Sequence, residues 1–267
     1  MDQLLQNVDK NRASGLILIH YRKAFDMVDH ELLLLKLKTY GIDEASNKWF
    51  ESYLLRRQQF VSYFGKVSNY QDVSHGVPQG SILGPLFFII YINDLPLHIQ
   101  TTDVEIDLYA DDTILMSSAD IDAIGCDLRS KLNQVWLEVE NWANANKMPL
   151  NESKTKSLLV TGKRLPGKID LQDKQLALVT SNGCMLEQVE TVKLLGLELD
   201  SEMTFTCHVD KLCKKLSQRI GVLNRIKCCL PFKQIILYYN SLVKSVMNYL
   251  NVVWHTCSKE ILLKVLR

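Results

Sequence analysis

Apolar residues in the first part of the chain follow two spacings, one typical of strands and one typical of helices. The continuous apolar run at 16–20 predicts a buried strand, preceded by a short helix over 4–13. Helical spacing over 31–40 and 43–56 predicts two further helices, and Gly41 is expected to end the first of them.

The middle of the chain combines two expected hairpins with one long helix. Residues 59–73 predict a hairpin, and the apolar segments 104–108 and 114–116 predict another. Between 121 and 142 the apolar residues recur at helical spacing, so a long amphipathic helix is expected to pack against the sheet. The side chains that define its apolar face are Ile121, Ile124, Leu128, Leu132, Val135, Trp136, Val139 and Trp142.

The last part of the chain changes from short strands to helices. The expected strands lie near 157–161, 175–180, 184–189 and 192–199. The expected helices lie over 206–230, 233–248 and 261–267, with Pro231 between the first two. A mixed sheet followed by helices indicates an α+β fold, divided into a sheet domain at 1–204 and a helical domain at 205–267.

Length and charge limit the functions that the composition allows. The chain has 267 residues, of which 47% are hydrophobic, so it can bury a sizeable core in one large domain or two small ones. Its net charge is only +1, so any affinity for nucleic acid must come from local clustering. One cluster lies between Thr206 and Leu230; a solvated helix face explains it equally well. Its basic residues are Lys211, Lys214, Lys215, Arg219, Arg225 and Lys227.

Cysteine usage and hydropathy indicate an intracellular protein of the nucleus or cytoplasm, not a secreted one. The seven cysteines form no CxxC pair, which favours reduced thiols with no disulfide partner over a zinc site. No signal peptide is visible, and the longest apolar run, at 82–92, is too short to cross a bilayer. No association with a membrane is therefore expected.

The most informative segment is Tyr109-Ala110-Asp111-Asp112, at the tip of the second expected hairpin. Adjacent carboxylates repel each other, and a divalent cation held between them and a phosphate removes that cost. Such a pair suits phosphoryl transfer assisted by two metal ions. The simpler alternative is an ordinary turn, in which aspartate is common.

A second informative segment, Gly76-Val77-Pro78-Gln79-Gly80-Ser81, precedes a long apolar run. The pattern predicts a loop that enters a buried helix, with Ser81 as its N-cap. Gly80 allows close approach of a ligand to the backbone, and the Gln79 amide offers a donor and an acceptor to a nucleotide. For this segment taken alone, an ordinary helix entry is the favoured explanation.

The order of these motifs resembles the palm of a reverse transcriptase, most closely the enzymes of LINE-type (non-LTR) retrotransposons. The resemblance extends from about residue 15 onward. The matching segments are KAFD with DH (23–30), HGVPQGSILGPLFFIIYINDL (75–95), YADD (109–112), NESKT (151–155) and LLG (194–196). It implies an antiparallel palm sheet backed by helices and a truncated helical thumb over 205–267, with most of the fingers missing.

The resemblance implies RNA-directed DNA synthesis on an RNA template and a DNA primer, with dNTPs and Mg²⁺ or Mn²⁺. Asp111 and Asp112 would be the metal ligands, and Lys154 would donate a proton to pyrophosphate. The nucleotide would contact Phe25, Gln79 and Gly80. The primer and template would contact Leu195, Gly196, Lys214, Lys215 and Arg219. Without the resemblance, Phe25 is as simply explained as a core aromatic and Lys154 as a solvated lysine.

One position departs from the family pattern. His20 stands where the family has an aspartate, five residues before Phe25, that binds both metals. Mg²⁺ prefers hard oxygen ligands, so an imidazole is a poor replacement, and a loss of about 10³-fold or more in rate is expected. Asp26 lies beyond the end of the strand, and Asp29 is expected to cap the helix that begins near Glu31.

Two functions of different classes therefore remain open. The first is a reverse transcriptase whose chemistry is impaired in this chain. The second is a catalytically dead retrotransposon relic that retains binding to nucleic acid. An RNA-dependent RNA polymerase is disfavoured by Phe25 and by YADD in place of a Gly-Asp-Asp turn.

Overall fold

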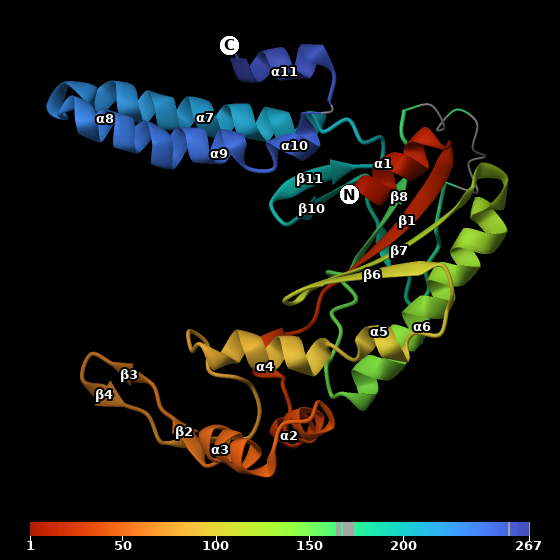
Figure 1. Ribbon diagram of the computed structural model, residues 1–267, viewed down its shortest axis with the longest axis vertical. Coiled ribbons are helices and arrows are strands. Elements are labelled where there is room, and N and C mark those ends of the chain that lie inside the picture. Colours follow the sequence, from red (N-terminus) through yellow and green to blue (C-terminus); the bar gives the residue numbers. More distant parts are fainter. Residues whose placement is uncertain (164–166, 168–173, 256, 267) are drawn as a thin grey trace.

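The computed structural model describes residues 1–163, 167, 174–255 and 257–266 of the chain (Figure 1). Its centre is a sheet with the strand order β6, β7, β1, β8 and β9. The strands are β1 (Arg12–Ile19), β6 (Val104–Tyr109), β7 (Asp112–Asp120), β8 (Lys156–Val160) and β9 (Glu187–Gln188). β9 is parallel to β8, whereas the other neighbouring strands are antiparallel. The mixed sheet with helices confirms the predicted α+β fold.

Strand β1 is the central strand and is buried on both faces of the sheet. Leu16 and Ile17 are 1% and 0% exposed, although adjacent side chains of a strand point to opposite faces. Leu16 belongs to the hydrophobic cluster on one face and Ile17 to the cluster on the other. A continuous apolar run is what this double burial requires, which explains why no alternation is visible there.

Helix α6 (Arg129–Ala145) covers one face of the sheet (Figure 1). It follows a 3₁₀ turn at Ile121–Ala123 and a π turn at Ile124–Leu128, so the long helix predicted over 121–142 is confirmed with an irregular start. Trp136 and Trp142 are buried core residues of this face, as their helical spacing predicted.

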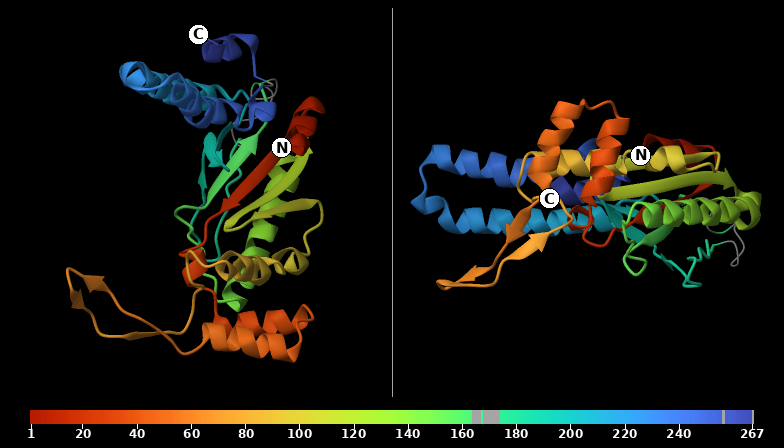
Figure 2. Two further views of the ribbon diagram at one scale, coloured as in Figure 1. Left: turned by 60° about the vertical axis from the view of Figure 1, so that its left-hand side comes forward. Right: turned by 90° about the horizontal axis from the view of Figure 1, so that it is seen from below.

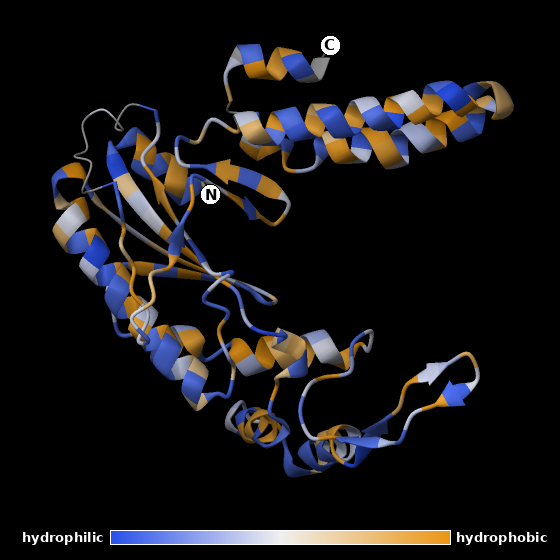
Figure 3. Ribbon diagram, turned by 180° about the vertical axis from the view of Figure 1, so that it is seen from behind, coloured by the Kyte–Doolittle hydropathy of each residue, from blue (hydrophilic) through white to orange (hydrophobic). Residues whose placement is uncertain are grey.

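Four helices and an extended arm lie at one end of the sheet (Figure 2). The helices are α2 (His30–Thr39), α3 (Glu44–Leu54), α4 (Leu83–Ile92) and α5 (Leu95–His98). The Asp29 side chain accepts a hydrogen bond from the Leu32 N–H at 3.0 Å, which confirms it as the cap of α2. Helix α4 is apolar over most of its length (Figure 3), and Phe87 and Phe88 are fully buried.

The arm between α3 and α4 is the predicted hairpin of residues 59–73. Its strands are β2 (Arg57–Gln59), β3 (Ser62–Tyr63), β4 (Lys66–Val67) and β5 (Gln71–Val73). β2 pairs with β5 and β3 pairs with β4, so the chain turns at Phe64 and Gly65. The arm projects away from the sheet, and Phe64 at its tip is 90% exposed (Figures 1 and 2).

The second face of the sheet packs against the N-terminal helix and against parts of the C-terminal third of the chain, whose helices extend beyond the sheet (Figure 1). These elements are α1 (Asp2–Asp9), the hairpin β10 (Thr191–Leu194) and β11 (Leu197–Asp200), α7 (Thr206–Ile226), α8 (Phe232–Tyr238), α9 (Ser245–Asn248), α10 (Asn251–Trp254) and α11 (Lys259–Leu266). A 3₁₀ turn at Lys227–Cys229 follows α7, and a π turn at Tyr239–Lys244 joins α8 to α9. Phe205 and Val209 are fully buried in the same hydrophobic cluster as Leu16 and Leu158 of the sheet.

Four expected elements differ in the structure. The helix expected over 4–13 ends at Asp9, because Arg12 already pairs with β7 as the first residue of β1. The strand expected over 192–199 is a hairpin that reverses at Leu195 and Gly196. The strands expected over 175–180 and 184–189 are reduced to one isolated bridge, between Val179 and Met185, and to the two-residue strand β9. The reason is that a strand needs a hydrogen-bonding partner along its length. Residue 267, the end of the last expected helix, lies outside the described residues.

All seven cysteines are free thiols. None of the helices in the described ranges has the length and apolar character needed to span a bilayer.

A substitution at Gly15 of β1 tests the tight packing between the sheet and α6. A Cβ atom there would lie 2.4 Å from Leu132 Cδ1, and the Leu132 side chain is fully buried. We expect Gly15→Ala to lower the free energy of unfolding by about 1–3 kcal/mol, measured by urea denaturation.

The matched control is Gly221→Ala in the middle of α7, where an added Cβ would meet nothing within 4 Å. This variant is expected to be more stable than the parent by about 0.5–1 kcal/mol, because alanine favours a helix interior. An unchanged or raised stability of Gly15→Ala would contradict the packing described here.

Candidate functional site

The predicted pair of carboxylates lies at the tip of the β6–β7 hairpin, as expected. Tyr109 pairs with Asp112, so Ala110 and Asp111 form the turn between them, and Ala110 has a φ of 52°. Both carboxylates are solvent exposed. Burial of part of the Asp112 carboxyl raises its pKa above the ordinary value, and the neighbouring charge of Asp111 raises this pKa further. The two neighbouring carboxylates therefore repel each other at the tip of the hairpin.

His20 lies beside Asp112. The antiparallel pairing of β1 and β7 reaches Ile19 and Thr113, so the next residues in the register, His20 and Asp112, face each other. In agreement with this, the charge of His20 lowers the pKa of Asp112 and offsets part of its rise. The position that departs from the family pattern is therefore next to the carboxylate pair in space.

The segment after His20 is held on one side by the loop at 149–155. The backbone N–H of Asn151 donates to the carbonyl of His20 at 2.7 Å, and the N–H of His20 donates to Thr155 Oγ1 at 3.2 Å. Lys154 lies in the turn between these two attachments, with its side chain exposed. Lys154, the predicted proton donor, therefore lies on a turn that is hydrogen-bonded to His20 at the end of β1.

On its other side the same segment is held by the loop at 75–79. The N–H of Val77 donates to the Phe25 carbonyl at 2.8 Å, and the N–H of Gly76 donates to the Val28 carbonyl at 2.7 Å. Gly76 has a φ of 88°, and a Cβ atom there would lie 2.8 Å from the Asp26 carbonyl oxygen. Only glycine therefore permits this close approach of the two backbones.

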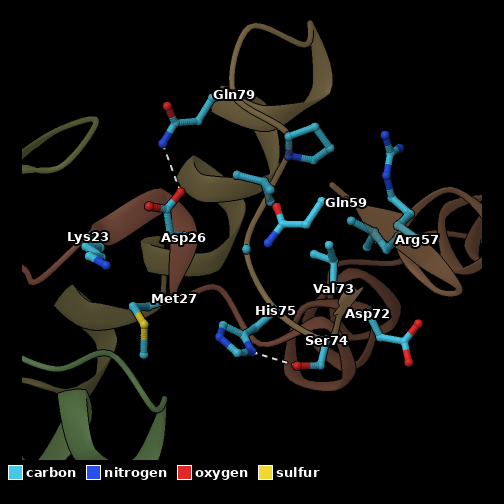
Figure 4. A pocket seen from close by; sticks show the side chains of 14 residues that line it. Lys23, Asp26, Met27, Arg57, Gln59, Asp72, Val73, Ser74, His75 and Gln79 are labelled. Carbon is cyan, nitrogen blue, oxygen red and sulfur yellow. Dashed lines mark hydrogen bonds between the residues drawn. The ribbon is translucent and has the colours of Figure 1, made fainter. Parts of the chain in front are cut away.

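A side-chain hydrogen bond joins the two segments as well (Figure 4). Gln79 Nε2 donates to Asp26 Oδ1 at 2.9 Å, above a cavity of about 540 Å³. Lys23 and Arg57 also line this cavity, so it carries basic groups from two separate parts of the chain. Sequence reasoning set Asp26 aside and did not single out Lys23 or Arg57, because nothing in their spacing shows that the arm meets this loop.

The remaining predicted nucleotide-site residues lie next to this cavity. Phe25 is half-buried, and its ring centroid is 4.6 Å from that of Phe88 in α4. A Cβ atom on Gly80 would meet nothing within 4 Å, so the space beside that backbone is open. The N-cap of α4 is Ile82, one residue after the predicted Ser81, although Ser81 Oγ accepts a hydrogen bond from the Gly84 N–H at 2.9 Å.

Leu195 and Gly196 form the turn of the β10–β11 hairpin. Leu195 lines a cavity of about 640 Å³ together with Asp112 of the carboxylate hairpin and Tyr249 of the helical region. The hairpin tip and the Leu195–Gly196 turn also lie on the same side of the sheet in Figure 1. The structure therefore brings together two motifs that lie far apart in the sequence.

Only part of the predicted basic face of α7 is available to bind a ligand. Lys214 and Lys215 are exposed, whereas the guanidinium of Arg219 donates to the Leu242 carbonyl within the helical region. Lys215 lines a cavity of about 340 Å³ with Lys193 and Lys211. Lys193 was missed by sequence reasoning, because a lysine on a short strand carries no signal of its own.

The carboxylate pair lies at the tip of a hairpin of the central sheet, and the loop at 75–79 bonds to the segment that leaves the central strand β1. A family model of reverse transcriptase (RNA-dependent DNA polymerase) matches residues 2–199. This chain belongs to the reverse transcriptase family.

Curated proteins similar to this chain are RNA-directed DNA polymerases and Pol polyproteins of non-LTR retrotransposons. It is 29% identical over 208 residues to the RNA-directed DNA polymerase from mobile element jockey of Drosophila melanogaster, covering 75% of this chain and 21% of the relative. It is 26% identical to a Pol polyprotein from the type-1 retrotransposable element R1 of Bradysia coprophila, covering 88% of this chain and 22% of the relative. The chain thus spans about a fifth of the length of these curated relatives.

Solved telomerase structures share the fold. Apo telomerase from Candida tropicalis has a TM-score of 0.52 at 11% identity, covering 99% of this chain and 48% of the telomerase chain. The same telomerase in complex with a TWJ fragment of telomeric RNA gives a TM-score of 0.51 at 13% identity, with 99% and 43% coverage. At these identities the likeness is evidence of a common polymerase fold and of nothing more specific.

In the part of the chain that the structure describes, no three or more His, Cys, Asp and Glu side chains gather closely enough to hold a metal ion. Asp111 and Asp112 are thus two exposed carboxylates, and the imidazole of His20 lies near Asp112.

The pKa of Asp112 provides a direct test of this arrangement. Since its folded pKa lies above the unfolded value, ionising Asp112 disfavours folding, and this unfavourable effect disappears as the pH falls below both values. We expect Asp111→Asn to lower the pKa of Asp112 and His20→Ala to raise it, as measured by NMR titration of the carboxyl carbon.

The control is Asp120→Asn at the far end of β7, where Asp120 is ion-paired with Arg12. It should leave the Asp112 titration unchanged. If the pKa of Asp112 did not change in His20→Ala, the register inferred for the ends of β1 and β7 would be contradicted.

Proposed function

We propose that this chain is the polymerase core of a retrotransposon reverse transcriptase that binds an RNA template, a DNA primer and dNTPs, and whose nucleotidyl transfer is impaired by His20. The observation that carries the proposal is that β1 and β7 pair up to Ile19 and Thr113, so that His20 lies near Asp112 and its charge acts on that carboxyl, at a position where the family has a metal-binding aspartate. Asp111 and Asp112 remain, so one ligand of the family's set is replaced while the surrounding fold is kept.

The acidic residues present fit one divalent cation. Asp111 and Asp112 offer the oxygen ligands that Mg²⁺ and Mn²⁺ prefer, and a cation there would relieve the repulsion that raises the pKa of Asp112. They fit a second cation poorly, because the third group is the imidazole of His20. When bound, such a cation supplies charge stabilisation to the phosphates.

The nucleotide would lie between the β6–β7 tip and the loop at 75–79. Gln79, held by Asp26, would orient the incoming nucleotide, and the open backbone at Gly80 would admit it closely. The Phe25 ring, supported by Phe88, would occupy the space of a ribose 2′-hydroxyl and so favour dNTPs. Lys154 would donate a proton to the pyrophosphate that leaves.

The primer and template would follow the side of the sheet that carries Leu195 and Gly196. The exposed ammonium groups of Lys214 and Lys215 would contact phosphates, whereas Arg219 would contribute less because its guanidinium already bonds within the helical region. A palm over 1–204 and a thumb-like part over 205–267 remain the proposed division. The proposed compartment is the nucleus or the cytoplasm.

The second candidate is a catalytically dead relic that retains binding to nucleic acid. The same observation favours it, since a polymerase that has lost a metal ligand keeps its basic side chains and its fold. The two candidates differ in whether any DNA synthesis is measurable.

Primer extension on a poly(rA) template with an oligo(dT) primer distinguishes them. We compare the unaltered chain with His20→Asp, which restores a carboxylate beside Asp112. We expect about 10³-fold faster extension by His20→Asp, because one electrostatic stabiliser of the transition state returns.

The control for that experiment is the double variant His20→Asp with Asp111→Asn, which should extend no faster than the unaltered chain. Equal and substantial extension by the unaltered chain and by His20→Asp would overturn the impairment. No extension by either, with binding intact, would favour the relic.

Salt dependence of binding tests the role of the α7 lysines separately from catalysis. The double variant Lys214→Gln with Lys215→Gln should bind a primer–template more weakly, and the slope of log K against log salt should fall in magnitude by about 1–2, because two phosphate contacts are lost. Lys10→Gln, beyond the end of α1 and exposed, is the matched control and should leave the slope unchanged. An unchanged slope in the double variant would show that these lysines are only a solvated helix face.

A further inference from the structure

A single tyrosine joins the C-terminal helical region to the Leu195–Gly196 turn. The hydroxyl of Tyr249, the residue that follows α9, donates a hydrogen bond to the Leu195 carbonyl at 2.6 Å. The donor and the acceptor are 54 residues apart in the sequence. The contact therefore couples two parts of the fold that meet only in the tertiary structure.

The turn itself has an unfavourable backbone conformation. Leu194 pairs with Leu197, so Leu195 and Gly196 are the two central residues, and their φ values are 46° and 88°. Positive φ at both positions is typical of a type I′ turn, which favours Asn-Gly. A positive φ is sterically unfavourable for leucine, so we expect a contact from another part of the chain to stabilise this turn.

The ring of Tyr249 supplies a second contact with the turn. A Cβ atom on Gly196 would lie 3.1 Å from Tyr249 Cε1, so the ring stands directly against the glycine. Glycine is thus required at this position by the ring as well as by the backbone. The hydroxyl bond and the ring contact together define where the turn lies.

Tyr249 is in turn anchored to the core. Trp254 is 4% exposed in the cluster shared with the sheet, and its indole N–H donates to the Tyr249 carbonyl at 3.0 Å. The path from the core to the turn therefore runs from Trp254 through Tyr249 to Leu195. Each step is a hydrogen bond or a packed ring.

The turn held in this way lies between the carboxylate tip and a basic cluster. Leu195 and Tyr249 line the cavity of about 640 Å³ that also includes Asp112. Gly196 and Tyr249 line the separate cavity of about 340 Å³ that includes Lys193 and Lys215. A displacement of the turn would change both cavities at once.

We infer that Tyr249 is a positioning residue that holds the Leu195–Gly196 turn in the place where it supports the recessed 3′ end of a primer. The inference rests on the proposed function, since it takes the turn as the contact with the primer. Tyr249 acts through the turn and does not itself touch the reacting atoms.

Hydrogen exchange of the free protein tests the hold of Tyr249 on the turn without any nucleic acid. Tyr249→Phe removes the hydroxyl and keeps the ring, so the backbone N–H groups of 194–198 should exchange about 3–10-fold faster. Tyr239→Phe, an exposed tyrosine of the same helical region, is the matched control and should exchange like the parent. Parent-like exchange in Tyr249→Phe would overturn the inference.

A rescue variant separates turn geometry from general loosening of the helices. Leu195→Asn places the favoured Asn-Gly pair in the turn, so exchange in the double variant with Tyr249→Phe should return toward that of the parent. If the double variant exchanges as fast as Tyr249→Phe alone, Tyr249 does not act through the shape of this turn, and the inference fails.

Fluorescence anisotropy with two labelled ligands tests the role in primer binding. Tyr249→Phe should raise the Kd for a primer–template with a recessed 3′ end about 3–10-fold and leave the Kd for single-stranded RNA unchanged. An equal change for both ligands, or none for either, would overturn the positioning role. If the unaltered chain binds neither ligand, the proposed function falls, and the exchange experiment alone decides whether Tyr249 holds the turn.

Discussion

The burial of β1 on both faces of the sheet is the constraint on which the rest of the structure depends. Leu16 and Ile17 enter two different hydrophobic clusters, so the strand has no freedom to shift its register without exposing one of them. The same register determines which residues meet beyond the end of the strand. His20 faces Asp112 for that reason, although neither side chain contributes to the core.

Backbone hydrogen bonds then assemble the site around the chain that leaves β1. The loop at 149–155 bonds to His20, and the loop at 75–79 bonds to Phe25 and Val28. Because His20, Phe25 and Val28 take part in these bonds through their backbone groups, the bonds do not depend on the side chain at position 20. A histidine can therefore occupy this position in a chain that keeps the fold and belongs to the family.

The helical C-terminal region is tied to the sheet by a shared core. Phe205 and Val209 pack in one cluster with Leu16 and Leu158, and Trp254 and Tyr249 extend this packing to the β10–β11 turn. The telomerases that share the fold at 11–13% identity illustrate how far a fold outlasts sequence similarity. The few exposed side chains at the candidate site can change independently of this core.

The sequence by itself determined the elements whose signal is local. The double-buried run of β1, the spacing of α6, the cap at Asp29 and the carboxylates at a hairpin tip were all visible in it, and so was the family. Only the tertiary structure decided that Gln79 bonds to Asp26, that Tyr249 bonds to Leu195, and that Lys193 joins Lys215 at one cavity. These contacts join residues far apart in the chain, and local periodicity holds no information on which distant surfaces meet. The strands expected within 175–189 failed for the same reason, because strand formation depends on a partner elsewhere in the chain.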